Sequence, residues 1–458
     1  MFDIDIDLIK KYDKPGPRYT SYPTAPHFHE GFTHVDYKNE IIRTNSGQNE
    51  RDLSLYYHLP FCDTLCYFCG CNMVITRNRD RISKYVGALK KEIDMLRDLI
   101  RDDRKAIQLH WGGGTPTHLN PDEIHDLISY INSKFVFRDN AEKGCEIDPR
   151  ELTRPHLEAL REGGFNRISM GVQDFNPKVQ EAVNRIQPES ITSQVVTWVR
   201  ELGFDSINLD LMYGLPFQTT EEFAKTVDKL IELSPDRVAV FNYAHVPWMK
   251  KHMNLINTED LPAPEEKLEI LKMTVAKLTG AGYEFIGMDH FAKPNDEMAI
   301  ALREKKLYRN FQGYSTHAGT DLYGAGITSI GQLERTYVQN IRTEKEYMAA
   351  LEEGKLPTTI GYMLNDDDML RREVIMKVMC DFELDYSFFE KKFDINFNEY
   401  FAYSIDKLNE FTEDGLVTFN EKGFSVSEMG RLLIRNIAMS FDGYLERKQD
   451  TARYSRTV

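Results

Sequence analysis

The sequence predicts an α/β fold: a partial (β/α)6 barrel with an N-terminal arm and a small, mostly helical, winged-helix-like C-terminal domain. Three observations support this prediction. Apolar strand-like runs alternate with helical patterns from residue 53 to about residue 290. Polar residues and glycines follow the ends of successive runs, as they do at the active-site end of such barrels. Beyond Asn365 the pattern changes to helices and a hairpin. The expected domains are 1–50, 51–365 and 366–458.

The strand-like runs are short, apolar or β-branched, and spaced as in a parallel sheet with crossover helices. Roughly six strand–helix units fit before residue 250, which indicates an open, incomplete barrel. Helices are expected after Ser83, which would be an N-cap, from Pro121 as a first-turn proline, and from Thr219–Glu222. The strand-like runs are Leu53–His58, Ile107–Trp111, Cys145–Asp148, Arg167–Met170, Ser206–Met212, Arg237–Tyr243 and Tyr283–Met288.

The N-terminal segment differs from the barrel in composition. Lys14–Pro23 contains too many prolines for a helix or a central strand. We therefore expect an extended arm. The interleaved Arg18, Tyr19 and Tyr22 favour an arm that docks on the protein, with a disordered leader as the alternative.

The C-terminal part has its own pattern. A helix is expected through Val374 and Val378, another over about 397–411, a hairpin within 415–426, and a last helix after Gly430. Its charge gives no reason to expect DNA binding.

Composition excludes several classes of function. Of 458 residues, 41% are hydrophobic and 28% charged, which is typical of a globular protein. The balance of 57 basic and 72 acidic side chains argues against binding to nucleic acid or to anionic membranes. No apolar run approaches the ~18 residues of a membrane span, and the first residues, such as Asp3 and Asp5, lack the positive charge of a signal peptide. Six cysteines, four of them clustered, in a long chain do not suggest a disulfide framework. These features indicate a reducing, cytoplasmic setting.

Four cysteines lie within ten residues, and the first three, Cys62, Cys66 and Cys69, have the spacing C-x3-C-x2-C. Three thiolates leave one iron of a four-iron cluster without a protein ligand. The amino group and carboxylate of S-adenosylmethionine can fill that position. Zinc is the alternative, but Cys69 and Cys71 are too close in sequence to ligate one ion easily. The loop, with Phe68 before the third cysteine, resembles that of the radical S-adenosylmethionine enzymes.

Further candidates follow the other predicted strands. The glycine run Gly112–Gly114 could bring backbone amides close to a ligand, although a tight turn would also use glycines. Glu146 and Asp210 could bind a ligand or simply cap strand ends. Gln173 follows the fourth run, and Ala244 follows the sixth.

Over nearly its whole length the chain resembles the oxygen-independent coproporphyrinogen III oxidases. The resemblance implies oxidative decarboxylation of two propionates of coproporphyrinogen III to vinyl groups, giving protoporphyrinogen IX in haem biosynthesis. It also implies the partial barrel named above. The matching stretches are Gly16–Thr24, Cys62–Asn72, His110–Thr117, Gly164–Arg167, Ser169–Phe175, Tyr213–Pro216, Phe241–His245, Gly287–Ala292 and Leu432–Ile437.

The resemblance also implies one [4Fe-4S] cluster on Cys62, Cys66 and Cys69, two molecules of S-adenosylmethionine, and no catalytic side chain, since the radical comes from the cofactor. Cys71 belongs to the loop but would not ligate the cluster. The first S-adenosylmethionine would contact Tyr56, Phe68, Gly113, Glu146 and Ile330. The second would contact Gly114, Thr115, Gln173, Arg185, Asp210 and Ala244.

The substrate is a tetracarboxylate, so a chain with a net charge of −15 needs local cations. The candidates are Arg18 on the arm and Arg309, because arginine pairs with carboxylates in a bidentate manner. An external flavodoxin- or ferredoxin-like electron donor, an unidentified acceptor and a monomeric state are also expected. Two alternatives are a haem-binding chaperone of the related type and a radical methyl transferase.

Overall fold

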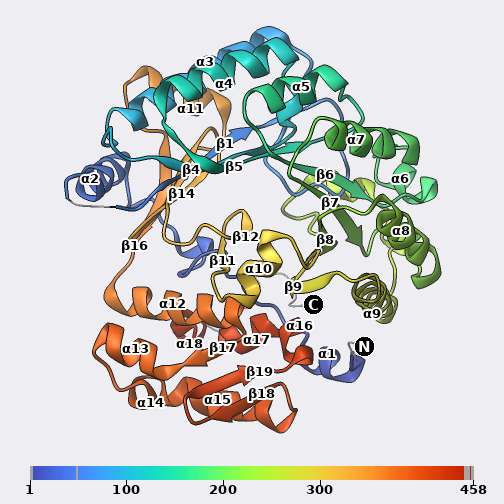
Figure 1. The fold of residues 1–458 in the computed structure, drawn as a ribbon, viewed down its shortest axis with the longest axis vertical. Coiled ribbons are helices and arrows are strands. Elements are labelled where there is room, and N and C mark those ends of the chain that lie inside the picture. The colour runs from blue at the N-terminus through green and yellow to red at the C-terminus, as the bar shows by residue number, and fades with distance from the viewer. Residues whose placement is uncertain (1–3, 48–49, 448–453, 455–458) are drawn as a thin grey trace. The chain divides into compact units, whose positions relative to one another are not determined.

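The computed structural model describes residues 4–47, 50–447 and 454, so that Met1–Asp3 of the predicted arm lie outside the described residues. The chain forms two compact units (Figure 1). Unit 1 contains 1–27, 268–318 and 364–458, and unit 2 contains 28–267 and 319–363. The units interleave along the chain, whereas the sequence suggested three consecutive segments. Residues 1–50 are divided between the two units.

Unit 2 is built around a sheet with the strand order β16-β15-β14-β13-β1-β4-β5-β6-β7-β8. The six strands from β1 to β8 in this order pair in parallel, and β13 joins β1 in parallel. Strands β14, β15 and β16 extend this side in antiparallel fashion. The bounds are β1 (Leu53–Leu59), β4 (Ala106–Gly113), β5 (Phe137–Ile147), β6 (Arg167–Gln173), β7 (Ser206–Tyr213), β8 (Arg237–Asn242), β13 (Asp321–Ala325), β14 (Ile330–Leu333), β15 (Thr336–Asn340) and β16 (Thr358–Met363).

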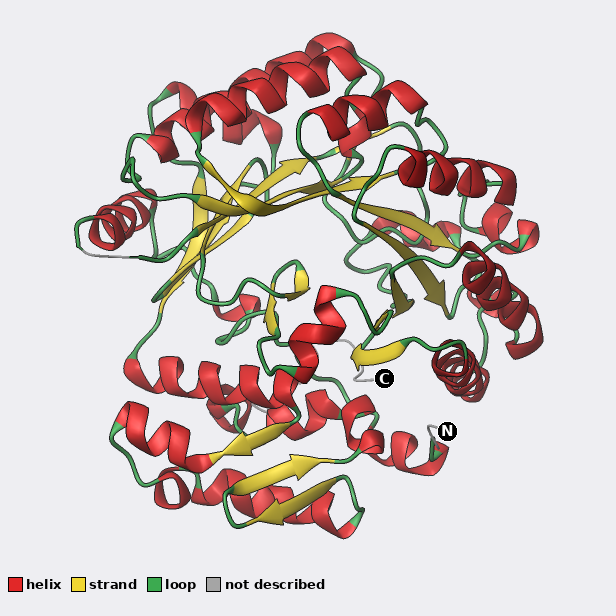
Figure 2. Cartoon of the chain, in the orientation of Figure 1, coloured by secondary structure: helices red, strands yellow, loops and turns green. Residues whose placement is uncertain are grey.

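Helices follow the parallel strands and cover the outer face of the curved sheet (Figure 2). This arrangement confirms the predicted alternation and the parallel α/β class. No helix in the described part of the chain is both long enough and apolar enough to cross a membrane. The bounds are α2 (His34–Asn45), α3 (Arg79–Arg97), α4 (Pro121–Lys134), α5 (Arg154–Glu162), α6 (Pro177–Ala182), α7 (Glu189–Glu201), α8 (Thr220–Leu233) and α11 (Glu344–Glu352), with α9 (Pro264–Gly280) crossing between the units.

Local sequence explains where these elements begin. Strand β1 is buried along almost its whole length, as expected for a parallel strand covered on both faces. Helix α4 begins at Pro121 after an Asn120 capping box. Helix α3 begins at Arg79, capped by Asn78, so the predicted start after Ser83 was wrong by about one turn.

Unit 1 holds the winged-helix-like segment, in which β17 and β18 flank β19. The predicted hairpin is confirmed as β18 with β19. The predicted helix over 397–411 is divided at Phe401, and the run at 283–288 forms a short hairpin, β9 with β10, rather than a parallel strand. The bounds are α1 (Ile6–Tyr12), β9 (Glu284–Gly287), β10 (His290–Ala292), α10 (Glu297–Arg303), β11 (Tyr308–Asn310), β12 (Gly313–Ser315), α12 (Asp366–Asp381), β17 (Glu383–Asp385), α13 (Tyr386–Phe393), α14 (Phe397–Tyr400), α15 (Ala402–Glu413), β18 (Val417–Asn420), β19 (Gly423–Val426), α16 (Glu428–Leu432), α17 (Ile434–Met439) and α18 (Gly443–Arg447).

The extended arm packs within unit 1. Tyr19 is buried, and its hydroxyl donates to Asp442 at 2.9 Å. Arg435 donates to the backbone oxygen of Pro17 at 3.0 Å. Tyr22 is fully buried, and its hydroxyl oxygen accepts a hydrogen bond from the N–H of Gly443 at 3.0 Å. These contacts confirm a docked arm and exclude the disordered leader for this stretch.

Candidate active site

The cysteine loop leaves the sheet at the carboxyl end of β1 and is closed by a short parallel pair, β2 (Phe61–Cys62) with β3 (Val74–Ile75). Val74 N–H donates to Pro60 O at 2.7 Å, and Tyr67 N–H donates to Val183 O, just after α6, at 3.0 Å. Phe68 is buried in an apolar cluster with Val183. The loop is therefore fixed at its ends and in its middle.

Folding of this loop brings three thiols close enough to influence one another. Desolvation raises the pKa of the Cys62 thiol to about 11; a hydrogen bond with Thr115 opposes this effect, and the nearby Cys69 and Cys66 thiols reinforce it. Thr115 Oγ1 lies 3.5 Å from Cys62 Sγ. No three His, Cys, Asp or Glu side chains of the described residues converge as around a single ion. Cysteines that ligate different irons of a cubane need no such convergence, so this donor set fits an iron–sulfur cluster.

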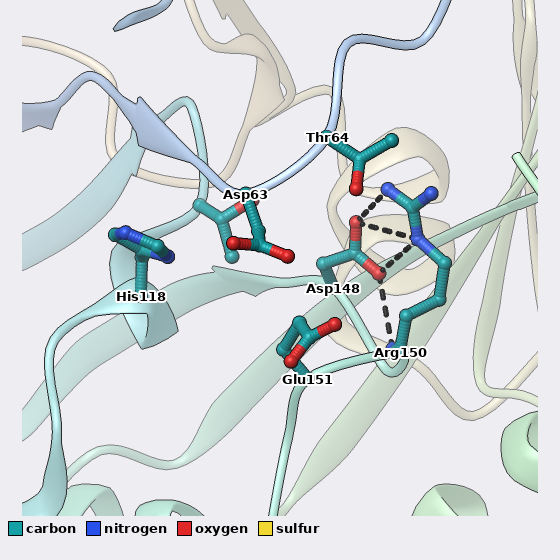
Figure 3. Close-up of a pocket in the computed structure, with 7 residues that line it drawn as sticks. Asp63, Thr64, His118, Asp148, Arg150 and Glu151 are labelled. Atoms are coloured by element: carbon teal, nitrogen blue, oxygen red, sulfur yellow. Dashed lines mark hydrogen bonds and ion pairs between the residues drawn. The ribbon is translucent and has the colours of Figure 1, made fainter. Parts of the chain in front are cut away.

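Two arginines point their guanidinium groups at Cys66. Arg150 Nη2 lies 3.5 Å from Cys66 Sγ, and Arg185 Nη1 lies 3.6 Å from it. Asp148 pairs with Arg150 at 2.6 Å (Figure 3). It also pairs with Arg185, at 3.3 Å. Burial acts to raise the pKa of Asp148, but Arg185 and Arg150 outweigh it and hold the pKa well below its ordinary value. The Cys66 thiol thus faces two guanidinium groups that Asp148 holds in place.

The far end of the cysteine loop is held by the loop after β8. Lys250 Nζ donates to Cys71 O at 2.9 Å, and His252 Nε2 lies 2.8 Å from Cys69 O. The Cys71 thiol hydrogen-bonds with the Cys69 sulfur, which lowers the pKa of Cys69 to about 7. The structure therefore places Cys71 against the third predicted cluster ligand.

The glycine run ends β4 beside the cysteine loop. Gly113 has φ +117°, and a Cβ there would lie 2.6 Å from the His58 ring. A Cβ on Gly114 would lie 2.4 Å from Pro60 O. Only glycine lets the backbone approach these neighbours so closely, so the run packs tightly against the start of the cysteine loop.

Glu146, on β5, accepts a hydrogen bond from Gly113 N–H at 3.1 Å. His110 Nε2 lies 3.3 Å from the other carboxylate oxygen, and the ring of Tyr56 stacks on His110 with centroids 6.1 Å apart. Desolvation acts to raise the pKa of Glu146, but the contacts with His110 and Gly113 hold the pKa below its ordinary value. The glutamate is therefore ionised and fixed beside the glycine run.

The next strands supply polar groups with unused hydrogen-bonding capacity. Gln173 has φ +69°, and its Oε1 is buried without a partner among the described residues, as is Nε of Arg185. Desolvation raises the pKa of Asp210 to about 7, although Asn208 donates to it at 2.7 Å. Buried polar atoms without partners are rare in proteins and are typical of a site for a polar ligand.

Two predicted contacts lie at the margins. Ala244 is exposed and follows β8. Ile330 begins β14, where it pairs with Gln339, so it lies two strands from β1.

The two predicted substrate arginines meet in unit 1. Arg309 is buried, donates from Nε to Arg18 O at 3.2 Å, and lies over the Tyr314 ring at 4.8 Å from its centroid. Its Nη1 has no hydrogen-bond partner within the described chain. Arg18 forms an ion pair with Asp289, which the sequence analysis did not single out.

Comparison with known proteins decides the family. The profile of the Radical SAM superfamily matches residues 56–230, and that of the HemN C-terminal domain matches 364–433. The oxygen-independent coproporphyrinogen III oxidase of Escherichia coli (strain K12) is 48% identical over 100% of this chain and 99% of its own length. That of Helicobacter pylori (strain J99) is 46% identical over 97% and 98%.

A solved structure agrees with the sequence relatives. The coproporphyrinogen III oxidase (HemN) from Escherichia coli, described as a radical SAM enzyme, matches with a TM-score of 0.92 at 47% identity, over 97% of this chain and 99% of the other. This chain belongs to the oxygen-independent coproporphyrinogen III oxidase family. It is a radical S-adenosylmethionine oxidoreductase, with the [4Fe-4S] cluster and S-adenosylmethionine that this family uses.

Several residues of this oxidase site were missed by the sequence analysis, among them His110, Asp148, Arg150 and Lys250. Asp148 could have been found, because it lies two residues after Glu146 and alternation places both on the same side of an extended chain. His110 lies two residues before the glycine run, so it could have been found in the same way. Arg150 carries no such signal, since its direction depends on the turn after β5.

Proposed function

We propose that this chain catalyses the anaerobic oxidative decarboxylation of two propionate side chains of coproporphyrinogen III to vinyl groups, giving protoporphyrinogen IX. The observation that carries the proposal is the three-cysteine loop beside the glycine run, in a chain 48% identical over its whole length to a curated oxidase. Six free cysteines suit a reducing compartment, so we place the activity in the cytoplasm.

Cys62, Cys66 and Cys69 would ligate three irons of the cluster and leave the fourth for S-adenosylmethionine. When bound, the cluster and S-adenosylmethionine would supply radical chemistry able to take a hydrogen atom from the β-carbon of a propionate. Carbon dioxide then leaves, and one electron passes to an acceptor. The side chains hold the reactants and supply no catalytic acid or base.

A first S-adenosylmethionine would be held at the glycine run. Ionised Glu146 can accept hydrogen bonds from ligand hydroxyl or ammonium groups, and Gly113 allows close approach of the backbone. Support comes from the fixed geometry of these two groups. The proposed contacts are Tyr56, Phe68, Gly113, Glu146 and Ile330.

A second S-adenosylmethionine would lie farther along the sheet. Gln173 Oε1 and Arg185 Nε, whose hydrogen bonds are unused within the described residues, support a polar ligand there. Arg185 can pair with a ligand carboxylate, and Asp210 with an ammonium group or hydroxyls. The proposed contacts are Gly114, Thr115, Gln173, Arg185, Asp210 and Ala244.

Arg309 and Arg18 would bind substrate propionates. A buried guanidinium with an unused N–H in the described structure supports this role for Arg309. Arg18 already pairs with Asp289, so it would have to share its charge. We further propose a monomer that receives electrons from a flavodoxin- or ferredoxin-like protein.

The deciding experiment is anaerobic incubation of cluster-reconstituted protein with coproporphyrinogen III, S-adenosylmethionine and a reductant. We expect divinyl product, carbon dioxide and 5′-deoxyadenosine, with each vinyl group matched by one carbon dioxide. Haem binding without vinyl product would favour the chaperone. A methylated product would indicate a methyl transferase.

The substrate assignment has its own test. Arg309→Gln should raise KM for coproporphyrinogen III by about tenfold or more, because a charge-assisted pair contributes about 1.5–3 kcal/mol. Uncoupled cleavage of S-adenosylmethionine without substrate should not change. An unaltered KM would refute the assignment.

A further inference from the structure

We propose that Arg150 tunes the reduction potential of the iron–sulfur cluster by donating a guanidinium N–H to the sulfur of Cys66. The inference rests on the proposed ligation of the cluster by Cys66. The couple concerned is the one-electron reduction of the cluster from the 2+ to the 1+ state, with the electron supplied by an external donor.

The position of Arg150 is set by Asp148. Nε and Nη2 of Arg150 donate to the two Asp148 oxygens at 2.9 and 2.6 Å, and the backbone N–H of Arg150 donates to Oδ1 at 3.1 Å (Figure 3). The side chains are 15% and 13% exposed. A guanidinium held through two of its nitrogens, on a residue whose backbone N–H is held by the same carboxylate, does not swing away, so the contact of Nη2 with Cys66 Sγ at 3.5 Å is a fixed feature.

The other arginine near this sulfur differs in one respect. Arg185 has an unused Nε in the described structure and is a proposed contact of a cofactor. The Nε and Nη2 groups of Arg150 are committed to Asp148 and Cys66. Arg150 therefore acts through the cysteine sulfur rather than by touching substrate, and it is a positioning residue.

Charge explains the direction of the effect. Reduction adds a negative charge to a cluster that already carries three thiolates, and hydrogen bonds to the sulfurs and local charge set its potential. A cation donating to a ligand sulfur favours the reduced state. Asp148 partly cancels that cation, so Arg150 and Asp148 should shift the potential in opposite directions.

The test is a dithionite titration of the reconstituted protein followed by electron paramagnetic resonance, with iron and sulfide content measured in parallel. Arg150→Met should lower the equilibrium constant for reduction by about tenfold, which is about 59 mV for one electron. Arg150→Lys keeps the charge and should shift the potential less. Arg154→Gln is the matched control, because Arg154 pairs with Glu158 and Glu201 and should leave the potential unchanged.

Asp148→Asn should shift the reduction potential in the opposite direction to Arg150→Met, which a purely structural role would not produce. Removing its negative charge should move the potential upward, while both substitutions weaken the same ion pair. Equal potentials in wild type and Arg150→Met, or a downward shift in Asp148→Asn, would overturn the inference. Failure of every Arg150 variant to retain iron would also overturn it, since the residue would then act in cluster retention.

The titration separates this inference from the proposed function. If wild type binds no four-iron cluster or never cleaves S-adenosylmethionine, the proposed function fails. If wild type does both and the Arg150 variants keep its potential, only the inference fails.

Discussion

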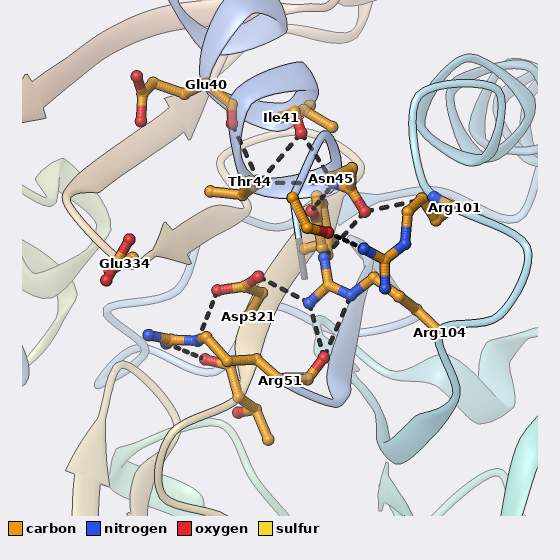
Figure 4. Close-up of polar contacts among 12 residues, drawn as sticks. Glu40, Ile41, Thr44, Asn45, Arg51, Arg101, Arg104, Asp321 and Glu334 are labelled. Atoms are coloured by element: carbon orange, nitrogen blue, oxygen red, sulfur yellow. Dashed lines mark hydrogen bonds and ion pairs between the residues drawn. The ribbon is translucent and has the colours of Figure 1, made fainter. Parts of the chain in front are cut away.

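The two ends of the parallel sheet in unit 2 differ in whether their buried polar groups have partners within the described protein. At the amino ends, fully buried Asp321 at the start of β13 pairs with Arg104 at 2.7 Å and with Arg51 at 3.0 Å (Figure 4). Arg104 also donates to Asn45 at 3.0 Å and to Arg51 O at 2.8 Å. Each buried charge in this network has a partner inside the protein.

At the carboxyl ends the same sheet leaves hydrogen-bonding groups unused. Gln173 Oε1, Arg185 Nε and Asn242 Oδ1 are buried without partners in the described part of the chain. An unpaired buried polar group costs about 1–3 kcal/mol.

The difference fits the proposed division of roles, in which the amino ends of the strands stabilise the fold and the carboxyl ends bind the cofactors. At the carboxyl ends, cofactor atoms would complete the hydrogen bonds that the protein leaves unused.

The largest effect is expected from removal of a cluster ligand at the carboxyl ends. Cys66→Ser should abolish formation of 5′-deoxyadenosine, because a cluster held by two thiolates is not retained in a form that cleaves S-adenosylmethionine. Iron and sulfide content and nucleoside product are the measurements. The melting temperature of the apoprotein should be almost unchanged, and normal nucleoside yield would contradict the ligand assignment.

At the amino ends of the strands, we expect a substitution to lower stability and to leave cofactor binding intact. Asp321→Asn should lower the free energy of unfolding by about 3–5 kcal/mol, because it leaves Arg104 as an uncompensated buried charge. Denaturant titration of the apoprotein measures this. Replacing both partners, as Asp321→Leu with Arg104→Met, should recover most of the loss. A folded Asp321→Asn protein should still bind S-adenosylmethionine, and wild-type stability in this variant would break the comparison.

A smaller effect concerns Asp210 and pH. Its pKa of about 7 in the folded protein lies above the ordinary value of 3.8. A raised pKa contributes stability that is complete below 3.8 and is lost as the pH rises through 7. Compared with Asp210→Asn, wild type should therefore gain about 2–3 kcal/mol on going from pH 8 to pH 5. If the free energy of unfolding changed with pH in the same way in both proteins, the pKa of the Asp210 carboxyl would not be raised.

The smallest effect is expected from an exposed pair near the amino ends. Arg138 donates twice to Asp52, at 2.7 Å each, but its side chain is 45% exposed. Solvent screens such pairs, so Arg138→Gln should shift the melting temperature by only a small fraction of the Asp321→Asn shift. Equal shifts would mean that burial does not distinguish the two ion pairs.

Much of the fold could be predicted from local pattern. The apolar runs and helical patterns located six parallel strands, because strands buried on both faces read as continuous apolar runs. The parallel strand β13 was missed. Helices α1 and α2 were missed, since they are short and depend on the caps Asp5 and Thr33. The interleaving of the two units could not be predicted, because it depends on packing between distant segments.

The spacing of residues along the sequence was enough to predict part of the site. The cysteine loop and the residues that end successive strands could be located, because parallel strands place their carboxyl ends together. Arg150 and Lys250 could not, since their direction depends on turns whose geometry only the folded chain sets. The assignment of Gln173 and Asp210 to a second S-adenosylmethionine stays a prediction.

The central claim is that three cysteines of the loop leave one iron of the cluster for S-adenosylmethionine. Mössbauer spectroscopy of protein reconstituted with 57Fe, recorded with and without S-adenosylmethionine, tests it most directly. The account predicts that one iron site of the four changes its signal when S-adenosylmethionine is added. A spectrum in which no iron site changes, as for a cluster ligated entirely by the protein, would contradict it.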